Sequence, residues 1–131
     1  PGMRDPGRAR PQPVNLLDIY PTLVELCGLP PREDLDGTSL VPLLRDPRAP
    51  RNPTVTTYWD GNHSVRDERW RYTRYHDGTE ELYDHAADPL EWRNLAGEPE
   101  HAAVKKELAR WMPSADAPDA PVERPRGKGP Y

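Results

Sequence analysis

The chain has 131 residues, enough for one domain, but its 34% hydrophobic content and 18 prolines predict a small core that depends on contacts with another part of a protein. Its formal net charge of −4 argues against a nucleic-acid partner, because phosphate backbones attract cationic surfaces. No apolar run is long enough for a membrane span, and the single Cys27 excludes an internal disulfide.

The first part of the chain is predicted to be extended and then helical. Residues 1–13 contain four prolines among glycine and arginine, which predicts an extended leading segment. Because the sequence opens on Pro-Gly-Met, we expect missing upstream chain, where any export signal would lie. From Val14 apolar residues recur at helical spacing, and Pro21 is expected to divide this helix into a turn and a restart. A second short helix is expected over residues 39–44.

The predicted helix after Val14 has one apolar face. Its members are Leu16, Leu17, Tyr20, Leu23, Val24 and Cys27. Cys27 is expected to pack there as a small buried hydrophobe. If the covering part of the protein is missing, an exposed apolar patch is expected around Leu16, Tyr20, Leu23 and Val24.

The middle of the chain has the pattern of an antiparallel sheet. Residues 54–59 are β-branched and aromatic, and residues 69–75 and 80–83 flank Asp77-Gly78, a strong hairpin signal. A helix opened by Pro99 follows, with one apolar stripe that should pack on the sheet. The fold class predicted is α+β, a small antiparallel sheet of about four strands packed with a C-terminal helix.

Three sequence patterns resemble functional sites, but a purely structural role is predicted for each. Arginines alternate with aromatic residues over 66–75, but neighbouring acidic residues favour ion pairs on a solvated sheet face over nucleic-acid binding. The run beginning at Asp60 fails as a calcium loop, because Val65 and Arg71 replace the required Gly and Glu. The four histidines lack the compact spacing of a zinc site, so no metal ligand is predicted.

Several blocks of sequence follow one another in a characteristic order between residues 11 and 113. They are 13–23 (PVNLLDIYPTL), 27–30 (CGLP), 35–44 (LDGTSLVPLL), 62–66 (NHSVR), 68–72 (ERWRY), 81–85 (ELYDH) and 88–96 (DPLEWRNLA). Together they resemble the late part of the type I sulfatase family, most of all its iduronate-2-sulfatase-like branch.

That resemblance implies a division of the chain and a missing partner. Residues 14–53 would end the alkaline-phosphatase-like N-terminal α/β domain and link it onward, and 54–113 would form the C-terminal subdomain. Independently of the resemblance, residues 114–131 contain too little apolar material to offset the cost of ordering, which predicts a disordered Pro-rich tail. The parent sulfatase would use formylglycine and calcium, on sulfated carbohydrate, in a compartment that the sequence leaves open but that could be periplasmic or extracellular. The formylglycine motif Cys-x-Pro/Ala-x-Arg does not fit around Cys27, where Leu29 and Pro31 occupy the key positions.

The catalytic centre is therefore expected outside this chain, which should be inert alone. Asn62, His63 and Arg66 are the predicted substrate contacts, because they could hydrogen-bond sugar hydroxyls or pair with anionic groups. Two alternatives stay open. One is a free-standing binding or scaffold module derived from a sulfatase, and the other is the same module from a phosphonate or phosphodiester hydrolase of the alkaline phosphatase superfamily.

Overall fold

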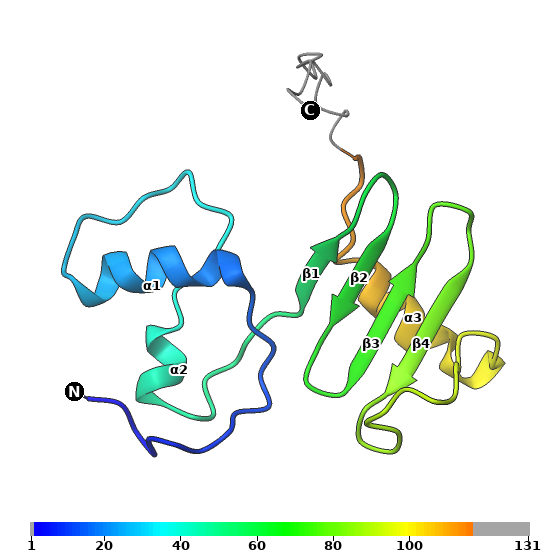
Figure 1. The fold of residues 1–131 in the computed structure, drawn as a ribbon, viewed down its shortest axis with the longest axis horizontal. Helices are drawn as coiled ribbons and strands as arrows, with labels where there is room; N and C mark the ends of the chain where they lie inside the picture. Colours follow the sequence, from blue (N-terminus) through cyan, green and yellow to red (C-terminus); the bar gives the residue numbers. More distant parts are fainter. Residues whose placement is uncertain (1, 117–131) are drawn as a thin grey trace, which may run out of the picture.

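The computed structural model describes residues 2–116, which form a helical part followed by a sheet backed by a helix (Figure 1). The helical part contains η1 (Leu16–Asp18), α1 (Ile19–Leu26) and α2 (Val41–Arg45). The sheet contains β1 (Thr54–Thr57), β2 (His63–Arg66), β3 (Trp70–Arg74) and β4 (Glu80–Asp84), and is followed by η2 (Pro99–His101) and α3 (Ala102–Ala109). This arrangement confirms the predicted α+β class. The predicted disordered tail lies mostly at 117–131, outside the described residues.

The first helix begins at a reciprocal cap. The Asn15 side chain accepts a hydrogen bond from the Leu17 N–H at 3.2 Å, and the Asp18 carboxylate accepts one from the Asn15 N–H at 2.7 Å. Pro21 falls in the first turn of α1, where its missing N–H breaks no helical bond, so the predicted division of the helix is wrong. The helix ends where Gly28 adopts a left-handed φ of 65°.

The four strands form an antiparallel meander in the order β1-β2-β3-β4, in agreement with the predicted sheet. Asp77 and Gly78 make the β3–β4 turn as expected, and Gly78 has a φ of 84° there. In the register, Val65 pairs with Tyr72 and Tyr72 with Leu82, which places all three on one face.

That face is covered by α3, which crosses behind the sheet (Figure 1). The core consists of Val65, Tyr72, Leu82, Ala96, Leu108 and Met112. Val65 and Leu82 have no exposed surface at all. The predicted stripe on the last helix is confirmed by Leu108 and Met112, whereas Trp111 stays 43% exposed.

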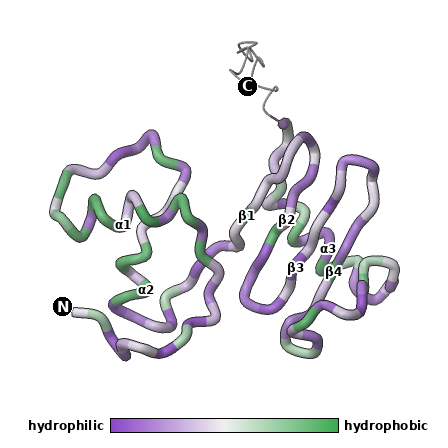
Figure 2. Tube along the Cα trace, in the orientation of Figure 1, coloured by the Kyte–Doolittle hydropathy of each residue, from purple (hydrophilic) through white to green (hydrophobic). Residues whose placement is uncertain are grey.

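The helical part leaves its apolar residues uncovered. Figure 2 shows the hydrophobic colouring that runs along η1 and α1. Leu16 is 83% exposed and Leu23 is 53% exposed, while α1 buries Thr22 and Val24 instead. The expected apolar patch is thus confirmed except at Val24, and the prediction of a buried Cys27 is wrong, because the thiol lies exposed at the C-terminal end of α1.

Candidate functional site

The three predicted substrate contacts lie along β2 but do not form one cluster. Asn62 precedes the strand in the β1–β2 turn, His63 begins it and Arg66 ends it. Because side chains alternate across a strand, His63 lies on the α3 side of the sheet and Arg66 on the opposite face. Asn62 and Arg66 therefore lie at opposite ends of β2, and a ligand that touches both would have to extend along the whole strand.

His63 is buried and fully engaged. Only 3% of the residue is exposed, and its Nδ1 lies 3.0 Å from the Thr57 hydroxyl while its Nε2 lies 3.0 Å from an Asp116 carboxylate oxygen. These contacts fasten the chain after α3 to the start of β2. Within the described residues, His63 presents no ring nitrogen to a ligand without a rearrangement.

Arg66 belongs to a charged group on the open face of the sheet. Its guanidinium lies 3.1 Å from Nε2 of His85, and the same Nε2 lies 2.5 Å from the Glu91 carboxylate. Glu91 also pairs with Arg71, the cross-strand neighbour of Arg66. Nε2 of His85 thus lies between a guanidinium and a carboxylate, and the tautomer of the ring decides which of the two it bonds. Among residues 2–116 Arg66 makes no ion pair with a carboxylate, so its charge can still be neutralised by an anion.

Asn62 holds two turns of the sheet together. Its Nδ2 donates to the Asp60 carbonyl at 3.0 Å, and its Oδ1 accepts from the His76 N–H at 3.2 Å in the β3–β4 turn. Gly61 has a φ of 70°, and a Cβ there would stand 2.8 Å from the His76 ring. The amide of Asn62 therefore fixes the shape of the β1–β2 turn, which is a positioning role.

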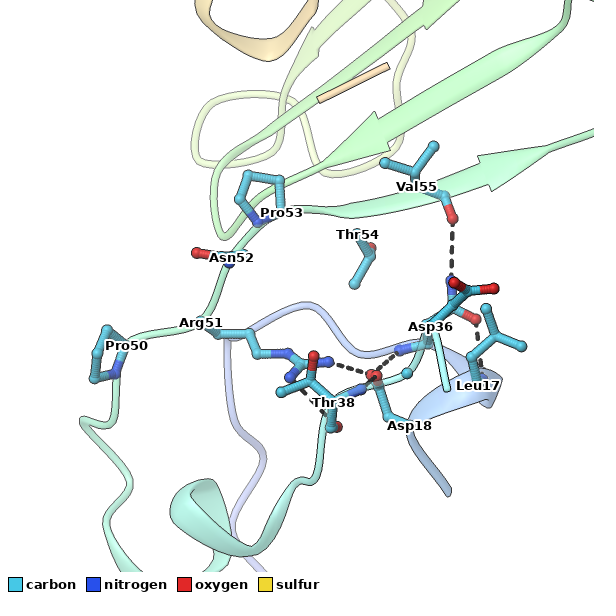
Figure 3. A pocket seen from close by; sticks show the side chains of 12 residues that line it. Leu17, Asp18, Asp36, Thr38, Pro50, Arg51, Asn52, Pro53, Thr54 and Val55 are labelled. Carbon is cyan, nitrogen blue, oxygen red and sulfur yellow. Dashed lines mark hydrogen bonds and ion pairs between the residues drawn. The ribbon is translucent and has the colours of Figure 1, made fainter. Parts of the chain in front are cut away.

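A second polar site, which the sequence did not predict, joins the helical part to the sheet (Figure 3). The carboxylate of Asp18 pairs with Arg51 and accepts the Thr38 N–H at 2.9 Å. Only 3% of the Asp18 side chain and 11% of the Arg51 side chain are exposed. Asn15 extends the junction by donating from Nδ2 to the Val55 carbonyl at 3.0 Å, at the first strand.

Burial and hydrogen bonding act on Asp18 in opposite directions. Desolvation by itself would raise the pKa of this carboxyl, but the N–H groups of Thr38 and Asn15 and the guanidinium of Arg51 stabilise its charged form. The pKa of Asp18 consequently lies below its ordinary value. A carboxylate that is ionised and already occupied by three donors is a poor general base, so this junction is structural.

The junction borders a pocket of about 370 Å³, and its wall depends on a glycine. A Cβ on Gly37 would stand 2.0 Å from the Leu17 carbonyl oxygen, so no larger residue fits without moving backbone. Asp36, Asn52 and Thr54 add polar groups to the pocket lining. The pocket holds no nucleophile paired with a base, and it gives no catalytic arrangement.

The described residues do not fit the cofactors of a sulfatase centre. Within residues 2–116 no group of three His, Cys, Asp or Glu side chains lies close enough to hold a metal ion. Cys27 stands at a helix end without the motif that formylglycine formation needs. In the same part of the chain, no helix is both long and apolar enough to cross a membrane.

The fold and these sites define a small α+β module with one closed core and one uncovered apolar helix. Residues 1–117 match the family model described as N-sulphoglucosamine sulphohydrolase, C-terminal, and the chain belongs to this sulfatase C-terminal family. A sulfatase of Formosa agariphila is 38% identical over 112 residues, which cover 85% of this chain and 22% of that protein. The Delta 4,5-hexuronate-2-O-sulfatase of Bacteroides thetaiotaomicron is 36% identical over 70% of this chain and 21% of its own length.

Solved structures give the same result for the fold. A 2-O GAG sulfatase superposes with a TM-score of 0.66 at 29% identity, over 82% of this chain and 26% of that one. The phosphonate monoester hydrolase of Agrobacterium radiobacter superposes with a TM-score of 0.55 at 32% identity, over 71% of this chain and 23% of that one. The chain thus spans about a fifth to a quarter of the relatives that it matches.

Proposed function

We propose that the chain serves as the C-terminal subdomain of a sulfatase that hydrolyses sulfuric esters of sulfated carbohydrate. The observation that carries the proposal is a match that covers 85% of this chain but only 22% of a sulfatase. The iduronate-2-sulfatase-like branch is our finer assignment, and the similarity to a hexuronate-2-O-sulfatase supports it.

The first role that we propose is to stabilise the parent enzyme through α1. Residues 14–53 would complete the outer layer of the large N-terminal domain, and 54–113 would form the subdomain beside it. Leu16, Tyr20 and Leu23 are at least half exposed, which gives α1 an apolar face for that neighbour. Formylglycine and calcium would belong to the neighbour as well, since residues 2–116 contain no group of side chains that could hold a metal ion.

The second role that we propose is to form a wall of the substrate cleft. Arg66 could bind a sulfate or carboxylate group, and Asn62 would act by shaping the β1–β2 turn. In an enzyme that joins this chain to the N-terminal domain of a sulfatase (the joined enzyme), Arg66→Ala should raise KM for an anionic saccharide or shift the substrate preference. Unchanged KM and preference would remove Arg66 from the substrate contacts, and His63→Ala tests the buried histidine in the same assay.

A related reaction is the main alternative. In this alternative the parent is a phosphonate or phosphodiester hydrolase, and the observation that supports it is the likeness to a phosphonate monoester hydrolase at a TM-score of 0.55. The free-standing binding or scaffold module is the other alternative, and it predicts that the isolated chain unfolds cooperatively as a stable monomer.

A domain exchange tests the proposal. The segment of the Formosa agariphila sulfatase that matches this chain is replaced by this chain, and sulfate release from sulfated saccharides is compared with that of the truncated and native enzymes. We expect the truncated enzyme to be inactive and the joined protein to release sulfate. A joined protein that folds but stays as inactive as the truncated one contradicts the proposal. A second assay uses the full-length protein to which this chain belongs, and turnover of an aryl phosphodiester without turnover of an aryl sulfate favours the alternative.

A further inference from the structure

The β1–β2 turn exposes two aromatic side chains beside polar groups. Tyr58 is 73% exposed and Trp59 is 75% exposed, and their rings form an edge-to-face pair with centroids 6.4 Å apart. Trp59 holds a left-handed φ of 57°, a conformation that bulky residues avoid. Trp59 therefore combines an unfavourable backbone conformation with a large apolar ring that is exposed to solvent.

The surroundings of Trp59 are polar and fixed in place. A shallow hollow of about 290 Å³ is lined by Trp59, Asp60, Asn62 and His76. Asn62 fastens this turn to the β3–β4 turn through His76, and Tyr58 donates its N–H to the Asn62 carbonyl at 2.9 Å. Asp60 and His76, 3.7 Å apart, are both largely exposed, so they retain donors and acceptors for a ligand.

We propose that this turn is a saccharide subsite in which Trp59 stacks on the apolar face of a sugar ring while Asp60 and His76 hydrogen-bond its hydroxyls. The π face of an aromatic ring is negative and attracts the C–H groups of a pyranose, while a few polar groups beside it fix the orientation of the ligand. The inference rests on the proposed function, because a saccharide is the substrate class of that enzyme.

The charge of the hollow selects which part of the saccharide binds. Asp60 is the acidic residue that lines it, 3.7 Å from His76, and its carboxylate repels sulfate and uronate groups. The subsite would therefore take an uncharged ring next to the sulfated residue, whereas anionic groups would be held elsewhere. At about 290 Å³ the hollow suits one ring rather than an oligosaccharide.

The test uses the indole N–H signals of the 131-residue chain in NMR titrations. The probes are cellobiose, unsulfated chondroitin disaccharide and its 6-O-sulfated form, each to about 20 mM, since a single-ring contact gives millimolar affinity. We expect the Trp59 signal to shift with cellobiose at least as strongly as with the sulfated disaccharide. Followed by the backbone amide signals of Asn62 and His76, Trp59→Ala should weaken binding by about tenfold, while Trp92→Ala, a similarly exposed control, leaves it unchanged.

Absence of any shift at Trp59 with all three probes overturns the subsite. It is also overturned if Trp92→Ala weakens saccharide binding as much as Trp59→Ala does. The joined enzyme gives a second measurement, in which Trp59→Ala raises KM for a sulfated saccharide by about tenfold but leaves KM for a small aryl sulfate unchanged. A Trp59→Ala variant that instead separates from the N-terminal domain, with KM unaltered, assigns Trp59 to the domain contact and overturns the subsite. Sulfate release by the unaltered joined enzyme continues to support the sulfatase role in either case.

Discussion

The sheet and the first helix use apolar residues in opposite ways. Around the sheet, Val65 and Leu82 are completely buried under α3, whereas α1 leaves Leu23 half exposed and buries Thr22, whose hydroxyl accepts the Leu40 N–H. Burial of apolar surface is the main force that stabilises a fold. The sheet part can therefore be stable alone, whereas the helical part would gain stability if its exposed apolar face were covered. Under the proposed function, the uncovered face of α1 is where the N-terminal domain of the sulfatase would pack.

The largest expected effect is at the junction between the two parts. Asp18→Asn should lower the free energy of unfolding by about 3–5 kcal/mol, because it leaves the Arg51 charge buried without its partner. Urea unfolding measures the loss. Asp34→Asn is the matched control, since Asp34 pairs with Arg32 on the exposed surface and its removal should change stability little.

The same carboxylate makes stability depend on pH. Its pKa is lower in the folded state than the ordinary value of 3.8, so the folded state binds fewer protons in that range. The contribution of Asp18 is therefore complete above about pH 5 and is lost as the pH falls through the folded-state pKa. Asp18→Asn should flatten this part of the acid unfolding curve, and an unchanged curve would contradict the assignment.

The next effect distinguishes the closed core from the uncovered helix. Leu82→Ala should destabilise the isolated chain by about 2–5 kcal/mol, because it opens a cavity in the core. Leu23→Ala, on the exposed face of α1, should cost about 0.5 kcal/mol or less. Equal losses in chemical denaturation would show that α1 is already covered in the isolated chain.

A smaller effect is expected where α3 meets the sheet. Lys105 donates to Glu80 at 2.7 Å, and this bond, together with that of the Tyr72 hydroxyl, lowers the pKa of Glu80. Lys105→Met should cost about 1 kcal/mol or less, because both partners are partly exposed. The loss should shrink as the pH falls below 4.5, the ordinary pKa of the Glu80 carboxyl, and should vanish once the pH is below the lowered pKa of the folded state. A loss that persists there would point to lost packing instead.

Local sequence patterns predicted the sheet well. The β-branched and aromatic residues and the Asp77-Gly78 turn predicted β1, β3 and β4, because strand preference and turn geometry are set by neighbouring residues. Pro21 was misread, because the short η1 helix before it moves the proline into a first turn. The burial predicted for Cys27 was wrong because α1 is oriented by the hydrogen bond that the Leu40 N–H donates to the Thr22 hydroxyl, which a hydrophobic pattern does not contain.

The candidate sites were harder to predict, because they depend on long-range pairing. Asp18 and Arg51 are 33 positions apart, although the Asn15-x-x-Asp18 spacing could have predicted the cap that places the carboxylate. Asn62, His63 and Arg66 are near one another in sequence, yet strand alternation separates them across two faces. Trp59 itself has a left-handed φ, and the sequence gives no sign of this conformation because the residue is not a glycine.

The central claim is that the rest of a sulfatase covers the apolar face of α1. Amide hydrogen exchange, measured on the isolated 131-residue chain and on the joined enzyme, tests this claim most directly. Exchange in α1 is expected to slow by about 100-fold or more in the joined enzyme, while β3 is protected in both proteins. Exchange in α1 that is equally slow in the isolated chain, or equally fast in an active joined enzyme, would contradict it.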